Sequence, residues 1–216
     1  GDYANAKKLY VRTIEILDSR KDYTSYVRYM ILNNLSTTCL ALNETKEAVN
    51  YSEQAIALIK QSQGVKSIEY IKSSNNLLIT YKKMGELAKA KQMLKDLLPI
   101  CKEVLGDDAD LLATIYLNAA VIAEAENDFN LAIQQINQSV KITIANFRKN
   151  FYTLSEQEKL NWWQEKEVIF SYYPSLLLRA DKPAPELIAD FANQQLQLKG
   201  FILTDASASL RKARAS

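Results

Sequence analysis

Histidine is absent from the 216 residues, and cysteine occurs only twice, as Cys39 and Cys101. The lack of histidine removes the commonest general base and the commonest metal ligand, and neither cysteine has a neighbour at metal-ligand spacing. Glycine and proline are also scarce, at five and four residues, which favours an all-α fold because both break helices. We therefore expect no enzymatic activity, no cofactor and no metal, and two buried, reduced thiols.

The chain also lacks an excess of charge of either sign, and it lacks long apolar runs. The chain carries 27 basic and 25 acidic residues, a net charge of +2. This balance argues against a nucleic acid or an anionic membrane as partner. The most apolar stretch, residues 111–125, is interrupted by Asn118 and Glu124 and is too short to span a bilayer. We expect no membrane insertion and a cytoplasmic location.

What the sequence does contain is a repeat with a period of 42 residues. An alanine recurs on this step, at Ala6, Ala48, Ala90 and Ala132. Five positions before each alanine stands a glycine or an asparagine: Gly1, Asn43, Gly85 and Asn127. An acidic residue follows each of these: Asp2, Glu44, Glu86 and Asp128. A fixed period of this size is typical of a solenoid.

Each repeat predicts a helix, a tight turn and a second helix. Glycine and asparagine tolerate the left-handed conformation that ends a helix, and the acidic residue would meet the positive dipole end of the next one. The small alanine would let the paired helices approach closely. First helices are predicted over 23–42, 65–84 and 108–126, and Met30, Ile31 and Leu35 belong to the apolar stripe of the earliest.

The turn, acidic residue and alanine of "GDYANA", "NETKEA", "GELAKA" and "NDFNLA" resemble the second helix of the tetratricopeptide repeat (TPR). The period exceeds the usual ~34 residues of that family and resembles the longer kinesin-light-chain variety. The resemblance implies a right-handed superhelix, an α-solenoid of antiparallel helix pairs, with a half-repeat and three full repeats in residues 1–149. A HEAT or armadillo array is the alternative, since its period also covers 42 residues. The recurring turn and acidic residue favour TPR.

After Phe147 the register of the repeat fails, and residues 150–216 are predicted to form a helical extension. Ser155 and Glu158 form a capping box that would start a helix near 156, and Pro174 would kink this helix or split it in two. Pro185 suits the first position of a further helix. These helices would cap the apolar edge of the last repeat.

Two further features belong to this extension. Trp162 and Trp163 are adjacent and point about 100° apart on a helix, so one is expected in the core and the other at the surface. The segments "FYTLSEQEKLNWW" and "DFANQQLQLKG" resemble the connector of bacterial TPR–CHAT proteins, in which a caspase-like protease follows the array. Because the chain begins at Gly1 in mid-repeat, we expect it to be a fragment, with any protease beyond Ser216.

Asparagine marks the same position in three successive first helices, at Asn34, Asn76 and Asn118. In TPR proteins resembling this chain, first helices line the concave groove. Each amide offers an acceptor and two donors, so the three would hold the backbone of an extended peptide. The alternative is that they bond neighbouring helices and stabilise the stacking. Asn33 and Asn75 double the asparagine in two copies.

Lysines on the middle first helix, Lys72, Lys82 and Lys83, would select an acidic peptide or a C-terminal carboxylate, unless they only form a solvated surface. The sequence thus predicts a non-catalytic protein- or peptide-binding region, the sensing part of a bacterial TPR–CHAT protein. The alternatives are the sensing array of a histidine kinase or transcription factor, a helical enzyme, or a structural scaffold. Ligand identity and oligomeric state stay open.

Overall fold

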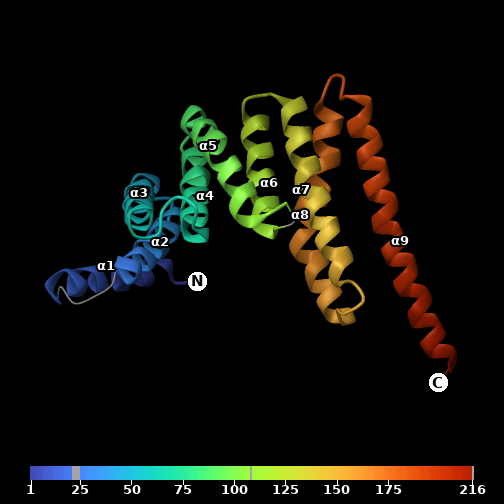
Figure 1. Ribbon diagram of the computed structural model, residues 1–216, viewed down its shortest axis with the longest axis horizontal. Helices are drawn as coiled ribbons and strands as arrows, with labels where there is room; N and C mark the ends of the chain where they lie inside the picture. The colour runs from blue at the N-terminus through green and yellow to red at the C-terminus, as the bar shows by residue number, and fades with distance from the viewer. Residues whose placement is uncertain (21–24, 108, 216) are drawn as a thin grey trace. The chain divides into compact units, whose positions relative to one another are not determined.

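The computed structural model describes the backbone of residues 1–20, 25–107 and 109–215, and the side chains of these residues up to Phe201. Every regular element in these ranges is a helix, which confirms the all-α prediction (Figure 1). The chain divides into two compact units, Gly1–Gly106 and Asp107–Ser216. No helix in the described part is both long and apolar enough to cross a membrane.

The first unit holds five helices: α1 (Tyr3–Arg20), α2 (Ser25–Ala41), α3 (Thr45–Ser62), α4 (Ile68–Lys83) and α5 (Leu87–Leu105). The second holds the other four described helices: α6 (Asp110–Ala125), α7 (Phe129–Asn150), α8 (Glu156–Arg179) and α9 (Pro185–Ala215). The predicted first helices correspond to α2, α4 and α6, each shorter by one to three residues at its ends. Residues 23, 24 and 108 of those predictions lie outside the described residues.

The turns inside the repeats adopt the left-handed conformation that the sequence indicates. The φ angles are 65° at Asn43, 77° at Gly85 and 61° at Asn127. In each turn the next amide bonds a carbonyl five residues earlier, as in the bond from Glu44 to Cys39 at 2.8 Å. This bond closes the preceding helix in the manner of a Schellman motif.

The acidic residue after each turn stands at or next to the start of a helix, but aspartate and glutamate act differently there. The carboxylates of Asp2 and Asp128 accept the backbone amide three residues on, at 3.1 and 3.0 Å. Glu44 and Glu86 occupy the N-cap position without a side-chain cap bond. Their longer side chains form ion pairs with lysines instead. The repeat position is therefore constant while its capping chemistry varies.

The recurring alanine lies where two helices of a repeat meet. Ala48, Ala90 and Ala132 are fully buried, whereas Ala6 is partly exposed. The hydroxyl of Ser36 on α2 donates to the carbonyl of Ala48 on α3 at 2.9 Å. Because serine has a short side chain, this bond requires the two helix backbones to lie close together. The predicted close approach of the helices is confirmed.

Helix α8 continues through Pro174, so of the two effects predicted for this proline, a kink or a split, the split is wrong. Proline removes one helical hydrogen bond. The helix persists because Phe170 and Tyr173 before the proline and Leu176 after it are buried in the same core. The predicted capping box of Ser155 and Glu158 is present. Helix α5 likewise contains a proline, Pro99, which the sequence analysis passed over.

Helices α8 and α9 pack on α7, as the sequence predicts for a cap on the last repeat. One core cluster joins the three helices, with Ile133, Ile136, Val140, Ile144, Ile169, Phe170, Tyr173, Leu176, Leu187 and Leu198 among its buried members. Trp162 packs against this cluster and stacks on Phe147, while Trp163 is 38% exposed. The division of the two tryptophans between core and surface is confirmed.

Both cysteines are buried free thiols. Burial raises the pKa of Cys39 to about 11 and that of Cys101 to about 12. We therefore expect both thiols in the folded chain to react with an aromatic disulfide reagent at pH 8 at least ~100-fold more slowly than in urea, because each pKa unit lowers the thiolate population about tenfold. A thiol that reacts quickly in the folded chain would contradict this burial.

Candidate functional site

A polar network joins the first helices of two successive repeats, α2 and α4. Asn33 accepts hydrogen bonds from the amide of Asn76 at 3.3 Å and from the hydroxyl of Ser73 at 3.1 Å. The hydroxyl of Ser73 also lies 3.3 Å from the hydroxyl of Tyr29. The Tyr29 hydroxyl in turn donates to the carbonyl of Glu69 at 3.3 Å. Asn76 therefore contacts the neighbouring repeat through part of its amide.

The partners in this network fix the register of the two helices. Each bond joins a residue of α2 to one 40 to 44 positions later in α4. At the far end, Lys83 donates to the carbonyl of Leu40 at 2.9 Å, where a cation meets the negative end of α2. Helices α2 and α4 thus run side by side in the same direction, and equivalent positions of the 42-residue repeat lie next to each other.

The remaining predicted site residues differ in exposure. Asn34 and Lys72 are exposed, and Asn33 and Asn76 are half-buried. Asn75 is only 6% exposed. Lys82 is exposed, and Asn118 lies half-buried on α6 in the second unit.

Exposed apolar side chains lie beside the asparagines. Met30 belongs to the predicted apolar stripe of this helix but is 46% exposed, so the stripe is not buried at this position. Val27 and Ile68 are 41% and 46% exposed. Their positions fall on the same stripes as the polar residues because residues three or four apart share a helix surface. We call the resulting surface the α2–α4 face, made of Val27, Met30, Asn34, Ile68, Lys72 and Asn76.

This face offers apolar contact, amide groups and one lysine charge on two parallel helices. Such side chains can form apolar contacts, hydrogen bonds and an ion pair with a bound segment. The exposed methionine is the residue that sequence reasoning missed. The only available signal was its spacing of four residues from Asn34, which does not show which side of α2 the neighbouring helices cover.

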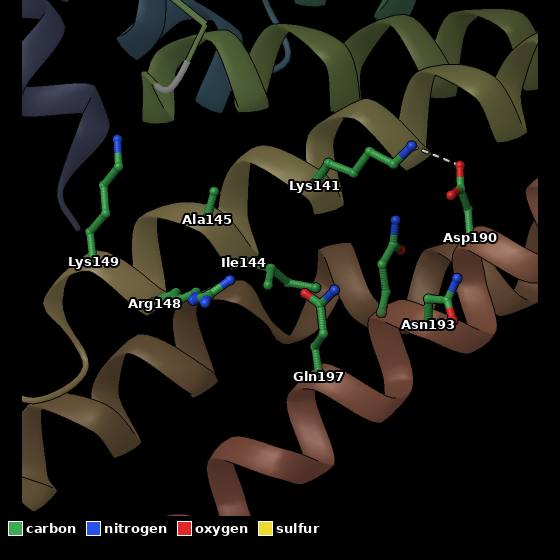
Figure 2. A pocket seen from close by; sticks show the side chains of 9 residues that line it. Lys141, Ile144, Ala145, Arg148, Lys149, Asp190, Asn193 and Gln197 are labelled. Carbon is green, nitrogen blue, oxygen red and sulfur yellow. Dashed lines mark hydrogen bonds and ion pairs between the residues drawn. The ribbon is translucent and has the colours of Figure 1, made fainter.

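Cavities occur elsewhere in each unit. One of about 330 Å³ lies between α4 and α5, with Tyr70, Ser74, Tyr81, Lys89, Gln92, Met93, Asp96 and Leu97 around it. Another of about 570 Å³ lies between α7 and α9 in the second unit (Figure 2). Neither cavity was predicted, because each depends on which helices pack together.

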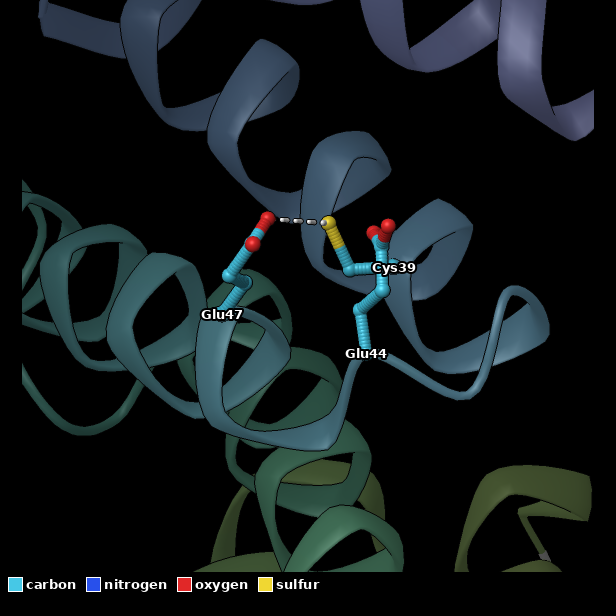
Figure 3. A group of neighbouring side chains, drawn as sticks. All are labelled: Cys39, Glu44 and Glu47. Carbon is cyan, nitrogen blue, oxygen red and sulfur yellow. Dashed lines mark hydrogen bonds between the residues drawn. The ribbon is translucent and has the colours of Figure 1, made fainter.

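A cysteine and two glutamates come together beside α1, with Cys39, Glu44 and Glu47 offering ligand atoms within 4.8 Å of one another (Figure 3). The ammonium of Lys7 lies against both carboxylates, 2.7 Å from Glu44 and in hydrogen-bond contact with Glu47. Hydrogen bonds to Glu44 and Glu47 raise the pKa of Lys7, and burial keeps the thiol protonated. This cluster already has its cation and ties α1 to α3.

A model of the family described as the tetratricopeptide repeat matches residues 28–103 and 69–145, which together span more than half of the chain. A search of curated proteins finds no match. The chain is similar to the crystal structure of BtubC (BKLC) from P. vanneervenii, with 16% identity, a TM-score of 0.68 and coverage of 97% of this chain and 75% of that one.

It is also similar to the crystal structure of a Podosopora anserina putative kinesin light chain with nearly identical TPR-like repeats. There the identity is 17%, the TM-score 0.60, and the coverage 92% of this chain and 89% of that one. A likeness to the apo form of RapI has 15% identity, a TM-score of 0.57 and coverage of 95% and 59%. At such identities these structures show the fold, and the family match decides the membership: the chain belongs to the tetratricopeptide repeat family.

Proposed function

We propose that the chain is a non-catalytic binding module that holds an extended segment of a partner protein on the α2–α4 face. Tetratricopeptide repeats serve protein interaction or scaffolding, which supports the general role. The observation that carries the specific proposal is the exposure of Met30 and Ile68 on the same helix stripes as Asn34 and Asn76. Exposed apolar side chains that gather on one face beside amide groups are typical of a contact surface.

The exposure of each side chain on this face determines which contact with the partner it would make. Asn34, which is exposed, would bond the partner's backbone, and Met30 and Ile68 would cover its apolar side chains. Lys72 would favour a carboxylate nearby. Asn76 would offer the partner what remains of its amide after the bond to Asn33, so both interpretations of the asparagines apply in part. We assign Lys83 and Asn75 to the contacts between helices. Asn118 lies in the second unit, so none of the three is at the centre of this site.

The test is a pulldown from a lysate of the source organism with a double variant, Met30→Ala with Asn34→Ala. Its matched control is Leu9→Ala with Thr13→Ala, an exposed apolar and polar pair with the same spacing on α1. We expect the α2 variant to retain a partner at least ~10-fold less well, since loss of a few central contacts commonly costs more than about 1.4 kcal/mol, while the control retains it. Equal retention by both variants, at unchanged thermal stability, would contradict the proposal.

A finer hypothesis places the module in a bacterial TPR–CHAT protein, where binding would regulate a caspase-like protease. It rests on the resemblance of residues 150–215 to the connector of those proteins. Reading the coding sequence after Ser216 tests it: a domain with a catalytic histidine and cysteine is expected, and any other domain directly after Ser216 would refute it. The sensing array of a histidine kinase or transcription factor, or a scaffold without a groove ligand, are the alternatives.

A further inference from the structure

The cavity between α7 and α9 has the size and polarity of a ligand site, and it lies on helices that the proposed function does not use. Its volume of about 570 Å³ falls within the usual range for small-molecule and peptide sites. Helix α7 contributes Lys141, Ile144, Ala145, Arg148 and Lys149, and helix α9 contributes Asp190, Asn193, Gln194 and Gln197.

A chain of hydrogen bonds that runs from the buried Gln194 to the exposed Lys141 shapes one wall of this cavity. The amide of Gln194, which is 4% exposed, donates to Asn137 at 2.6 Å, and the amide of Asn137 donates to Asp190 at 2.7 Å. The ammonium of Lys141 meets the same carboxylate oxygen of Asp190 at 2.7 Å. The wall is therefore rigid, and the charge of Lys141 is already neutralised.

The same wall leaves one acceptor unused. The side-chain oxygen Oε1 of Gln194 is buried and has no hydrogen-bond partner among the described residues. A buried acceptor without a donor costs stability, so this wall is not fully satisfied by its own hydrogen bonds. Gln194 lines the cavity together with Asn193 and Gln197.

The opposite end of the cavity presents a positive charge. Figure 2 shows the side chain of Arg148 directed toward Ile144 and Gln197, whereas Lys149 points away from them. Within the described part of the chain Arg148 forms no ion pair or hydrogen bond. Asn193 and Gln197 lie one helical turn apart on α9, with exposed amides. A guanidinium binds a carboxylate through two parallel hydrogen bonds, and the amides match peptide groups, which also donate and accept.

We propose that the α7–α9 cavity binds a short acidic peptide segment. Its carboxylate pairs with Arg148, and its backbone contacts Asn193 and Gln197. Ile144 and Ala145 form the apolar floor under its methylene groups. A peptide also offers N–H and C=O groups to the amides of Asn193 and Gln197, whereas inorganic phosphate offers mainly acceptors.

The test measures binding of a fluorescent, end-blocked peptide of alternating glutamate and alanine to the full 216-residue chain by anisotropy, at ~0.15 M salt to suppress non-specific attraction. The same peptide with glutamine for glutamate, and inorganic phosphate as competitor, form the other arms. The variants are Arg148→Gln and, as a control for loss of one exposed positive charge, Arg12→Gln. We expect the dissociation constant to rise roughly tenfold with Arg148→Gln or with the glutamine peptide, and to stay unchanged with Arg12→Gln.

No binding at millimolar peptide, equal effects of the two arginine variants, or equal binding of the glutamate and glutamine peptides would each overturn the proposal. Displacement of the bound peptide by inorganic phosphate at concentrations below the dissociation constant of the peptide would identify a simple anion site and also refute it. The double variant Met30→Ala with Asn34→Ala is expected to bind the peptide as the unchanged chain does. The proposal for this cavity and the proposal for the α2–α4 face are therefore tested independently.

Discussion

Replacing Tyr173 with alanine is expected to lower the free energy of unfolding of the second unit by roughly 3–5 kcal/mol, as for other large side chains removed from cores. The side chain is 1% exposed, and its ring meets that of Phe191 edge-on at 5.1 Å. Its hydroxyl donates to the carbonyl of Leu187 at 3.0 Å, so it ties α8 to the start of α9. Urea unfolding monitored by tryptophan fluorescence measures the effect, because both tryptophans lie on α8.

Two variants separate the contributions of Tyr173. Tyr173→Phe keeps the ring but removes the hydroxyl bond to the Leu187 carbonyl, which is expected to cost about 0.5–1.5 kcal/mol. Tyr152→Ala removes a side chain that is 83% exposed and should change stability by less than ~0.5 kcal/mol. If Tyr173→Ala were as mild as Tyr152→Ala, the extension would not be an integral part of the core of this unit.

Enlarging Ala48 to leucine is expected to destabilise the first unit by about 1–3 kcal/mol or more, because the added methyl groups have no space between α2 and α3. Ala48 is fully buried, and Ser36 bonds its carbonyl across the gap. The matched control is Ala57→Leu, an exposed position on the same helix. Thermal and urea unfolding followed by circular dichroism would show the difference, and equal effects of the two substitutions would mean that the repeat alanine does not set the distance between the helices.

The part of the fold that the sequence predicts best is the part determined locally. Turns at Asn43, Gly85 and Asn127 follow from backbone preferences of single residues, and the buried alanines follow from the period itself. The register of α2 against α4 also follows, since partners 40 to 44 positions apart reproduce the 42-residue step. These features need no knowledge of distant contacts.

The features that sequence reasoning missed depend on packing between distant segments. Helix α8 continues through Pro174 because buried residues on both sides of it share one core. The exposure of Met30 depends on which side of α2 its neighbours cover. The α7–α9 cavity arises from contacts between residues 49 to 57 positions apart, such as Asn137 with Asp190, and no motif marks it.

Site-specific photocrosslinking tests the central claim, that the α2–α4 face binds the partner. A photoreactive phenylalanine analogue is placed at Asn34 on this face and, in a second protein, at Ala57 on α3, where the side chain is also exposed. We expect the partner of the pulldown, mixed with each protein, to crosslink at position 34 through one extended segment and not at position 57. Crosslinking at position 57 alone, or equally at both positions, would contradict it.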